Sequence, residues 1–166
     1  MTGASAAGFV LGKVLSTRDP VVCEATATAT TTETAIFSVR NRREFAGRVN
    51  SREFIPIHLR AAIETANRLM QVRVYVNPTV VGSQSWTYLD QSNSAIEIST
   101  SAVTLTTSTG RKVESGPVPS GSPLLMDLRD FDLRTEPGDV IVVTVQTPPS
   151  GMSTAVTTVS LSGLEE

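Results

Sequence analysis

Residues able to act as a nucleophile or a general base are scarce in this chain, which has one cysteine and one histidine. Nucleophilic catalysis by Ser or Cys requires a base within hydrogen-bond reach, and that base is usually His. His58 lies in a strand-like run beside Pro56, without a partner motif around it, so we expect a structural role. Cys23 lies in an apolar run and lacks the local signature of a catalytic thiol, so we expect it to be buried and inert. We therefore predict no catalytic residues and no enzymatic activity.

Candidate metal ligands crowd between residues 127 and 139, where the acidic residues are Asp127, Asp130, Asp132, Glu136 and Asp139. Calcium takes oxygen ligands at such clusters, but this spacing is not that of an EF-hand, and Arg129 and Arg134 interrupt it. One Cys and one His also cannot supply a standard zinc set. We predict a solvated turn region with no metal. No Gly-rich phosphate loop is present, so no cofactor is predicted either.

The positive charge of the chain is local. The segment from residue 40 to residue 52 carries five arginines: Arg40, Arg42, Arg43, Arg48 and Arg52. Three interpretations stay open for it: a solvated loop or edge strand, a contact to an acidic protein surface, or phosphate binding. Because the net charge of the chain is −2, we expect no general nucleic-acid binding.

Size and composition suit one domain with a core of Val, Ile, Leu and Ala. The chain has 166 residues, of which 40% are hydrophobic and only 5% aromatic. Nearly a quarter of the residues are Ser or Thr, which is typical of a sheet with wet outer faces. No apolar run approaches the ~20 residues needed to cross a bilayer, and the N-terminus does not read as a secretion signal. The single cysteine favours synthesis in a reducing cytoplasm.

Alternating apolar residues predict about nine strands, and no long helix. The clearest is 69–76, with Val72, Val74 and Val76 on one face. Others are expected at 34–39, 53–65, 86–89, 95–98, 103–106, 140–147 and 153–161, and the short apolar run at 124–128 fits either a strand or a single helical turn. Pro56 confines its strand to an edge or a bulge. Prolines and glycines predict a surface loop at 115–123, and the last two strands are expected to pair as a terminal hairpin.

The N-terminal part has a different composition. Residues 1–33 are predicted to form an extended arm or linker before a β-sandwich domain at 34–166. The stretch from residue 21 to residue 34, at the end of the arm, alternates Ala and Thr, which fits either a strand or a low-complexity linker. Phe9 and Leu11 are the arm's candidate contacts to a partner. The predicted fold is all-β, an antiparallel sandwich of the jelly-roll or Ig-like kind with an extended N-terminal arm.

Four segments together carry a resemblance to a known class of protein. They are Ala35–Arg40, Val72–Thr79, Trp86–Asp90 with Ser94–Glu97, and Glu136–Val140 leading to Ser153–Leu161. Over residues 34–163 these strand and turn patterns resemble the small β-sandwich accessory proteins of tailed-bacteriophage virions.

The resemblance implies a non-enzymatic structural protein, made in the host cytoplasm and located in the virion. Its leading form is a capsid decoration (cement) protein that binds the lattice of the major capsid protein. A collar or tail adaptor, or a fibre-anchoring protein, is the alternative, and a host-glycan-binding module is a second one. The implied partners are phage capsid or tail proteins and further copies of the chain, with a trimer as one candidate assembly.

Overall fold

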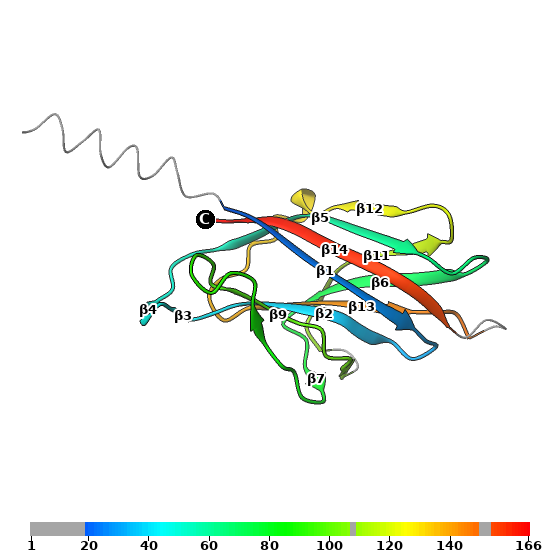
Figure 1. The fold of residues 1–166 in the computed structure, drawn as a ribbon, viewed down its shortest axis with the longest axis horizontal. Helices are drawn as coiled ribbons and strands as arrows, with labels where there is room; N and C mark the ends of the chain where they lie inside the picture. Colours follow the sequence, from blue (N-terminus) through cyan, green and yellow to red (C-terminus); the bar gives the residue numbers. More distant parts are fainter. Residues whose placement is uncertain (1–18, 107–108, 150–153) are drawn as a thin grey trace, which may run out of the picture.

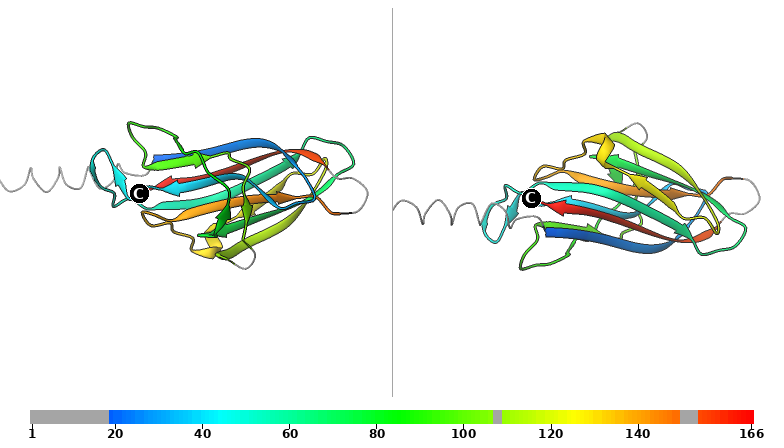
Figure 2. Two further views of the ribbon diagram at one scale, coloured as in Figure 1. Left: turned by 90° about the horizontal axis from the view of Figure 1, so that it is seen from below. Right: turned by 90° about the horizontal axis from the view of Figure 1, so that it is seen from above.

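The computed structural model describes residues 19–106, 109–149 and 154–166, which form two packed layers of antiparallel strands (Figure 1). One layer is a four-stranded sheet, in the order β1 (Asp19–Ala29), β14 (Ala155–Glu165), β5 (Phe54–Ile63) and β12 (Leu124–Asp127). The other is a six-stranded sheet, in the order β11 (Arg111–Pro119), β6 (Leu69–Val76), β13 (Val140–Gln146), β2 (Thr34–Asn41), β9 (Ile96–Ser99) and β8 (Thr87–Tyr88). The predicted all-β antiparallel sandwich is confirmed, and Figure 2 shows its layers from two further sides.

The order of the strands identifies the winding as a jelly roll. In chain order the principal strands are β1, β2, β5, β6, β11, β12, β13 and β14. The first, eighth, third and sixth of them make up one sheet, and the fifth, fourth, seventh and second lie side by side in the other. This is the double-sheet arrangement produced by two Greek keys. It decides between the jelly-roll and Ig-like alternatives that the sequence left open.

The remaining elements are short insertions in this frame. Strands β8 and β9 extend the larger sheet beside β2. Two small two-stranded sheets pair β7 (Val80–Val81) with β10 (Thr104–Leu105) and β3 (Glu44–Phe45) with β4 (Arg48–Val49). Among the described residues, one 3₁₀ turn, η1, covers Arg129–Phe131. No described helix is long enough or apolar enough to cross a membrane.

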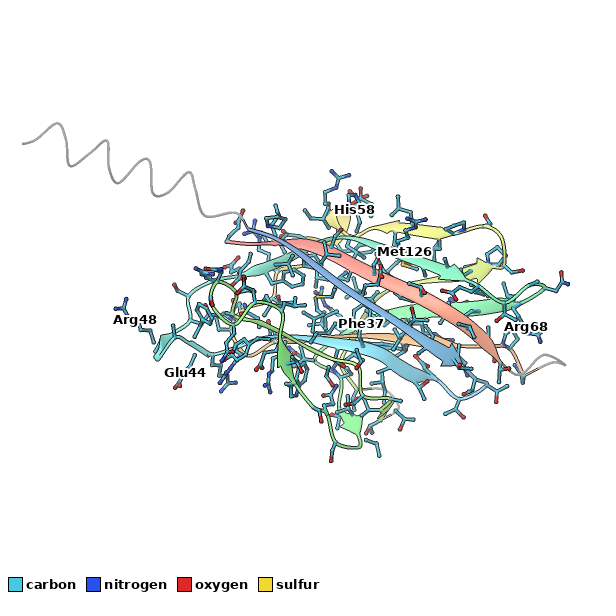
Figure 3. The ribbon with its side chains drawn as sticks, viewed as in Figure 1. Phe37, Glu44, Arg48, His58, Arg68 and Met126 are labelled. Atoms are coloured by element: carbon cyan, nitrogen blue, oxygen red, sulfur yellow. The ribbon has the colours of Figure 1, made fainter. Side chains whose placement is uncertain are left out.

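The core lies between the two sheets, and the period of two in the sequence builds it. In β6, Met70, Val72 and Val74 are buried, while Gln71 and Arg73 point to the opposite face and stay partly exposed. Strand β14 alternates in the same way, because successive strand residues face opposite sides of a sheet, whereas the central strand β13 is buried on both faces from Ile141 to Val145. Phe37, labelled in Figure 3, is one of the largest side chains that this core buries completely.

The predicted surface loop at 115–123 is wrong over most of its length. Strand β11 continues to Pro119 and pairs with β6 through the segment that holds Gly116, Pro117 and Pro119. Because β11 is the outer strand of its sheet, a proline there can point its missing N–H away from the neighbouring strand. The prolines and glycines at 115–123 suggested a loop, whereas the position of β11 at the edge of its sheet allows these residues to form a strand.

The predicted terminal hairpin is also wrong. Strand β13 pairs with β2 and β6, while β14 pairs with β1 and β5 in the other sheet. In a jelly roll, strands that follow one another along the chain cross between the sheets, so neighbours in sequence need not be neighbours in the ladder. Alternation predicted both strands but carried no information on their partners.

Part of the predicted N-terminal arm requires correction as well. Residues 19–29 form β1, which pairs with β14 along its whole length, so the Ala/Thr segment is a strand of the sandwich over this range. The predicted boundary between residues 33 and 34 therefore lies inside the sandwich. Phe9 and Leu11 lie outside the described residues. At Pro56 the predicted bulge is confirmed, because the β14–β5 register shifts between Ser162 and Gly163, opposite this proline.

Candidate contact site

The arginine-rich segment forms a hairpin that projects from one end of the sandwich. Strands β3 and β4 are joined by Ala46 and Gly47, whose φ angles are 51° and 74°. Two successive positive φ values define the tight turn whose twist suits a two-residue hairpin. The labelled side chains of Glu44 and Arg48 mark this projection in Figure 3, at the opposite end of the molecule from Arg68.

Buried amides hold the base of the hairpin. The Asn41 side chain donates to the carbonyl oxygens of Arg52 and Thr135, at 2.8 and 3.0 Å. The Asn50 side chain donates to Asn41 Oδ1 and to the carbonyl of Arg42, both at 2.7 Å, and its own Oδ1 accepts from the Arg52 N–H at 2.9 Å. Because both amides are buried, these bonds are shielded from competing water. The hairpin therefore leaves the sandwich in a fixed direction.

A buried carboxylate ties the same region to the end of β14. The Glu165 side chain is 0% exposed and accepts from Ser94 Oγ at 2.6 Å, from the Ala95 N–H at 2.9 Å and from Arg52 Nη1 at 3.2 Å. The Arg52 guanidinium also lies over the Phe45 ring, 5.6 Å from its centroid. Arg52 thus joins the hairpin, the 89–95 loop and the C-terminal strand into one unit.

A second carboxylate organises Arg40 and Arg42. Glu97 on β9 has a side chain that is 6% exposed, and it forms ion pairs with both arginines. The Arg40 guanidinium stacks on Trp86 at 4.3 Å from the ring centroid, and Arg42 lies over Tyr88 and donates to its hydroxyl. Both aromatic rings therefore already face a cation. Both arginines are therefore bound to Glu97 within the protein and are not free to bind a partner.

The remaining two arginines are the open ones. Arg43 and Arg48 form no ion pair or side-chain hydrogen bond with any described residue, and the Arg43 side chain lies against Gly138. Val49, beside Arg48, is 86% exposed, which is the highest value among the large apolar residues described. Two shallow hollows flank the hairpin, with volumes of about 380 and 450 Å³. The site, residues 42–52, is thus a projecting knob of mixed charge with an exposed apolar residue near its tip.

The arginine segment is therefore split by the structure. Arg40, Arg42 and Arg52 are used in internal pairs, while Arg43 and Arg48 face outward. Sequence reasoning missed the residues that hold the knob, namely Asn41, Asn50, Ser94, Glu97 and Glu165. Glu97 did carry a signal, since a single charge inside the run Ala-Ile-Glu-Ile has to find a partner if the strand is covered.

Three of the five acidic residues at 127–139 have partners: Asp127 and Asp132 pair with arginine, and Asp139 accepts from the Asn77 side-chain amide and the Glu136 N–H. Arg129 binds Asp127 through two nitrogens, and its side-chain and backbone hydrogen bonds hold the pKa of Asp127 well below its usual range. Arg134 pairs with Glu53 at 3.2 Å and with Asp132 at 3.6 Å. In the described ranges no group of three or more His, Cys, Asp and Glu is placed to hold a metal ion.

The two candidate nucleophile and base residues lie in different surroundings. Burial raises the pKa of the Cys23 thiol to about 12, as expected for an inert thiol between the sheets. His58 lies in β5, opposite Asp127 of β12, where it is half-buried. Neither residue lines the two hollows beside the hairpin.

Comparison with known proteins assigns this chain to no sequence family, so the protein is classified by its fold. No family model and no curated protein matches the sequence. Among solved structures, a mitogen derived from Yersinia pseudotuberculosis aligns with 86% of this chain and 86% of its own, at 12% identity and a TM-score of 0.41. A chain of sacbrood virus of honeybee in expansion state II aligns with 86% of this chain and 80% of its own, at 12% identity and a TM-score of 0.36. A chain of the T13 IBDV viral particle aligns with 89% of this chain and 35% of its own, at 13% identity and a TM-score of 0.27.

These likenesses are distant, and we rest no functional argument on them. The strand order by itself defines the protein as an antiparallel jelly roll.

Proposed function

We propose that this protein is a non-enzymatic structural component of a tailed-bacteriophage virion, a capsid decoration protein that binds the lattice of the major capsid protein. The observation that carries the proposal is the rigid knob at residues 42–52, fixed by buried amides and by Glu165 and tipped by Arg48 and Val49. A rigid knob binds a fixed surface at a low cost in conformational entropy. Jelly rolls also recur in viral capsid domains, which is an analogy of fold that adds plausibility but not a partner.

The ionisable groups of this end favour adhesion over catalysis. Its two buried carboxylates, Glu97 and Glu165, each pair with arginine, and neither lines the two hollows beside the hairpin. A catalytic site instead needs a nucleophile or a base that can reach a bound substrate. The charges here stiffen the frame and leave the exposed tip to make contact.

The chemistry of the knob also suggests what it contacts. Arg43 and Arg48, which have no ion-pair partner among the described residues, lie on the same hairpin as the exposed Val49, and Glu44 lies directly opposite Val49. The complementary partner surface presents carboxylates around a small apolar depression, since charge complementarity sets the register and apolar burial supplies the affinity. Phe9 and Leu11, outside the described residues, remain proposed secondary contacts.

Binding to purified, decoration-free heads tests the proposal. Wild-type protein should co-sediment with the heads. The variants Arg48→Glu and Val49→Asp should bind roughly ten- to a hundredfold more weakly, because each places a charge where the partner offers like charge or an apolar surface. Arg111→Glu is the matched control, because it reverses an exposed arginine on β11, at the far edge of the larger sheet. Protein that ignored such heads and occupied only tails would refute the decoration role.

Copy number per virion separates the alternative roles. Hundreds of copies fit decoration, whereas a dozen or fewer fit a collar or tail adaptor. The glycan-binding alternative loses support from the geometry, because the Trp86, Tyr88 and Phe45 rings of this end are already faced by Arg40, Arg42 and Arg52. Sugar-binding sites commonly need such a ring face to be open.

A further inference from the structure

The four edge strands of the two sheets differ in the features that hinder backbone pairing with a strand of another chain. The outer strands are β1, β12, β11 and β8. Strand β8 has two residues and β12 has four. Strand β11 is longer but carries two prolines and a register shift between Lys112 and Glu114. Short strands, prolines and bulges all hinder edge-to-edge pairing. Strand β1 has 11 residues in an unbroken register and lacks these devices beyond Pro20.

The hydrogen bonds of β14 reveal which backbone groups of β1 are free. Glu166 exchanges two backbone bonds with Glu53, and Val156 accepts one from Glu64, so even-numbered residues of β14 direct their polar groups toward β5. Successive residues of a strand alternate sides, so odd-numbered residues of β14 bond to β1. Their register partners in β1 are the odd-numbered residues from 19 to 29. The even-numbered residues of β1 therefore point their N–H and C=O groups away from the sheet.

Four complete donor and acceptor pairs follow from this alternation. They belong to Val22, Glu24, Thr26 and Thr28. The N–H and C=O groups of these residues point away from β14, and they form no backbone hydrogen bond with any other described residue. Their side chains are exposed on the outer face, whereas Cys23 and Ala25 between them are buried. The one proline of β1, Pro20, also lies at an even position, where its missing N–H costs the β1–β14 ladder nothing.

We propose that β1 pairs antiparallel with β1 of a second copy of this chain, around a two-fold axis at Ala25. In this register Val22 lies opposite Thr28 and Glu24 lies opposite Thr26 of the other copy. All four free residues of each strand then form about eight inter-chain backbone hydrogen bonds, two for each hydrogen-bonded pair. The two four-stranded sheets become one continuous sheet.

The charges and sizes of the side chains favour a second copy in this register. Glu24 is the only charged residue between 21 and 29, and the axis at Ala25 keeps the two Glu24 carboxylates from lying opposite each other. An axis at Glu24 itself would place them face to face. On the inner face, Ala25 meets Ala25 of the other copy, and small residues allow close approach there. An interface of this kind is self-complementary, as two-fold symmetry requires.

The first experiment measures the mass of the full chain in solution by sedimentation equilibrium. A dimer of twice 17.6 kDa is expected. Thr26→Pro removes an outward N–H and the side-chain hydrogen bond to Thr158 but no hydrogen bond of the β1–β14 ladder, and it should yield a monomer with unchanged strand content by circular dichroism. Thr26→Ala is the matched control, because it also deletes the hydrogen bond to Thr158 but keeps the N–H, and it should stay dimeric. A wild-type monomer or trimer, or a Thr26→Pro dimer, would overturn the proposal.

A second experiment tests the register with variants that do not disturb the backbone. Thr26→Glu should raise the dissociation constant roughly two- to thirtyfold, because two like-charge pairs with Glu24 are created, and Thr26→Lys should lower it. In a Cys23→Ala background, Ala25→Cys should form a disulfide between the copies on mild oxidation. Equal dissociation constants for the Glu and Lys variants, or no cross-link, would refute this register. Because these measurements use the isolated protein, their outcome is independent of whether it binds phage heads.

Discussion

Removal of the buried carboxylate of Glu165, which anchors the knob to β14, should strongly destabilise the protein. The side chain is 0% exposed and accepts hydrogen bonds from Ser94, Ala95 and Arg52. In Glu165→Ala the Ser94 hydroxyl and the Ala95 N–H lose their acceptor inside the protein. Each such loss costs about 1–3 kcal/mol. Arg52 is 40% exposed, so water replaces most of its interaction, and its contribution is about 0–1 kcal/mol.

The expected decrease in the free energy of unfolding is thus about 4 kcal/mol, a large part of the ~5–15 kcal/mol of a typical domain. Urea denaturation followed by circular dichroism measures it, and a slope of about 2 kcal/mol/M predicts a midpoint lower by about 2 M. Glu165→Gln keeps one acceptor oxygen and should lose only about 1–2 kcal/mol. Glu44→Ala, an exposed carboxylate on the knob, is the control and should stay within about 0.5 kcal/mol of wild type. A loss below about 1 kcal/mol for Glu165→Ala would refute the anchoring role.

Three further predictions test local features of the fold. Ala46→Asn should raise the free energy of unfolding by about 0.5–1 kcal/mol in thermal denaturation, because Asn tolerates the φ of 51° that precedes Gly47 better than Ala does; a lower melting temperature would contradict this turn. Gly163→Ala should destabilise by about 2–3 kcal/mol in urea, since a Cβ there would lie 2.5 Å from the Ile55 carbonyl oxygen, and an unchanged midpoint would show that this contact is loose. The pKa of Cys23, raised by burial from 9.0 to about 12, predicts stability that is unaffected below pH 9 and falls between pH 9 and 12, where only the unfolded state releases the proton. The Cys23 contribution to the slope is about 1.4 kcal/mol per pH unit, and Cys23→Ala should remove this contribution in urea titrations between pH 9 and 10, below the range in which Tyr75 titrates.

Much of the fold could be read from local pattern. The alternation at 69–76 and the continuous apolar run at 140–147 correspond to β6 and to the central strand β13. The burial of Cys23 and the bulge at Pro56 were also predictable, because the first depends on an apolar run and the second on the missing N–H of proline. These features depend on a residue and its immediate neighbours.

The contact site was predictable only in part. The sequence marked the arginine-rich segment, but three of its five arginines are bound to Glu97 and Glu165, which lie far away along the chain. The pairing of Arg52 with Glu165 joins residues separated by 113 positions. No spacing rule reports such a contact, because it exists only after β5 and β14 lie side by side.

The sequence by itself determined where strands run, which of their faces are apolar, and that the surface is rich in Ser and Thr. Only the tertiary structure decided which strands are neighbours, which arginines stay free, and that β1 ends a sheet with its even-numbered backbone groups unpaired. The reason is that the two-residue period depends on the types of side chain along a strand. The pairing of strands depends on backbone N–H and C=O groups, which are the same in nearly every residue. Partners are therefore chosen by the packing of the whole core.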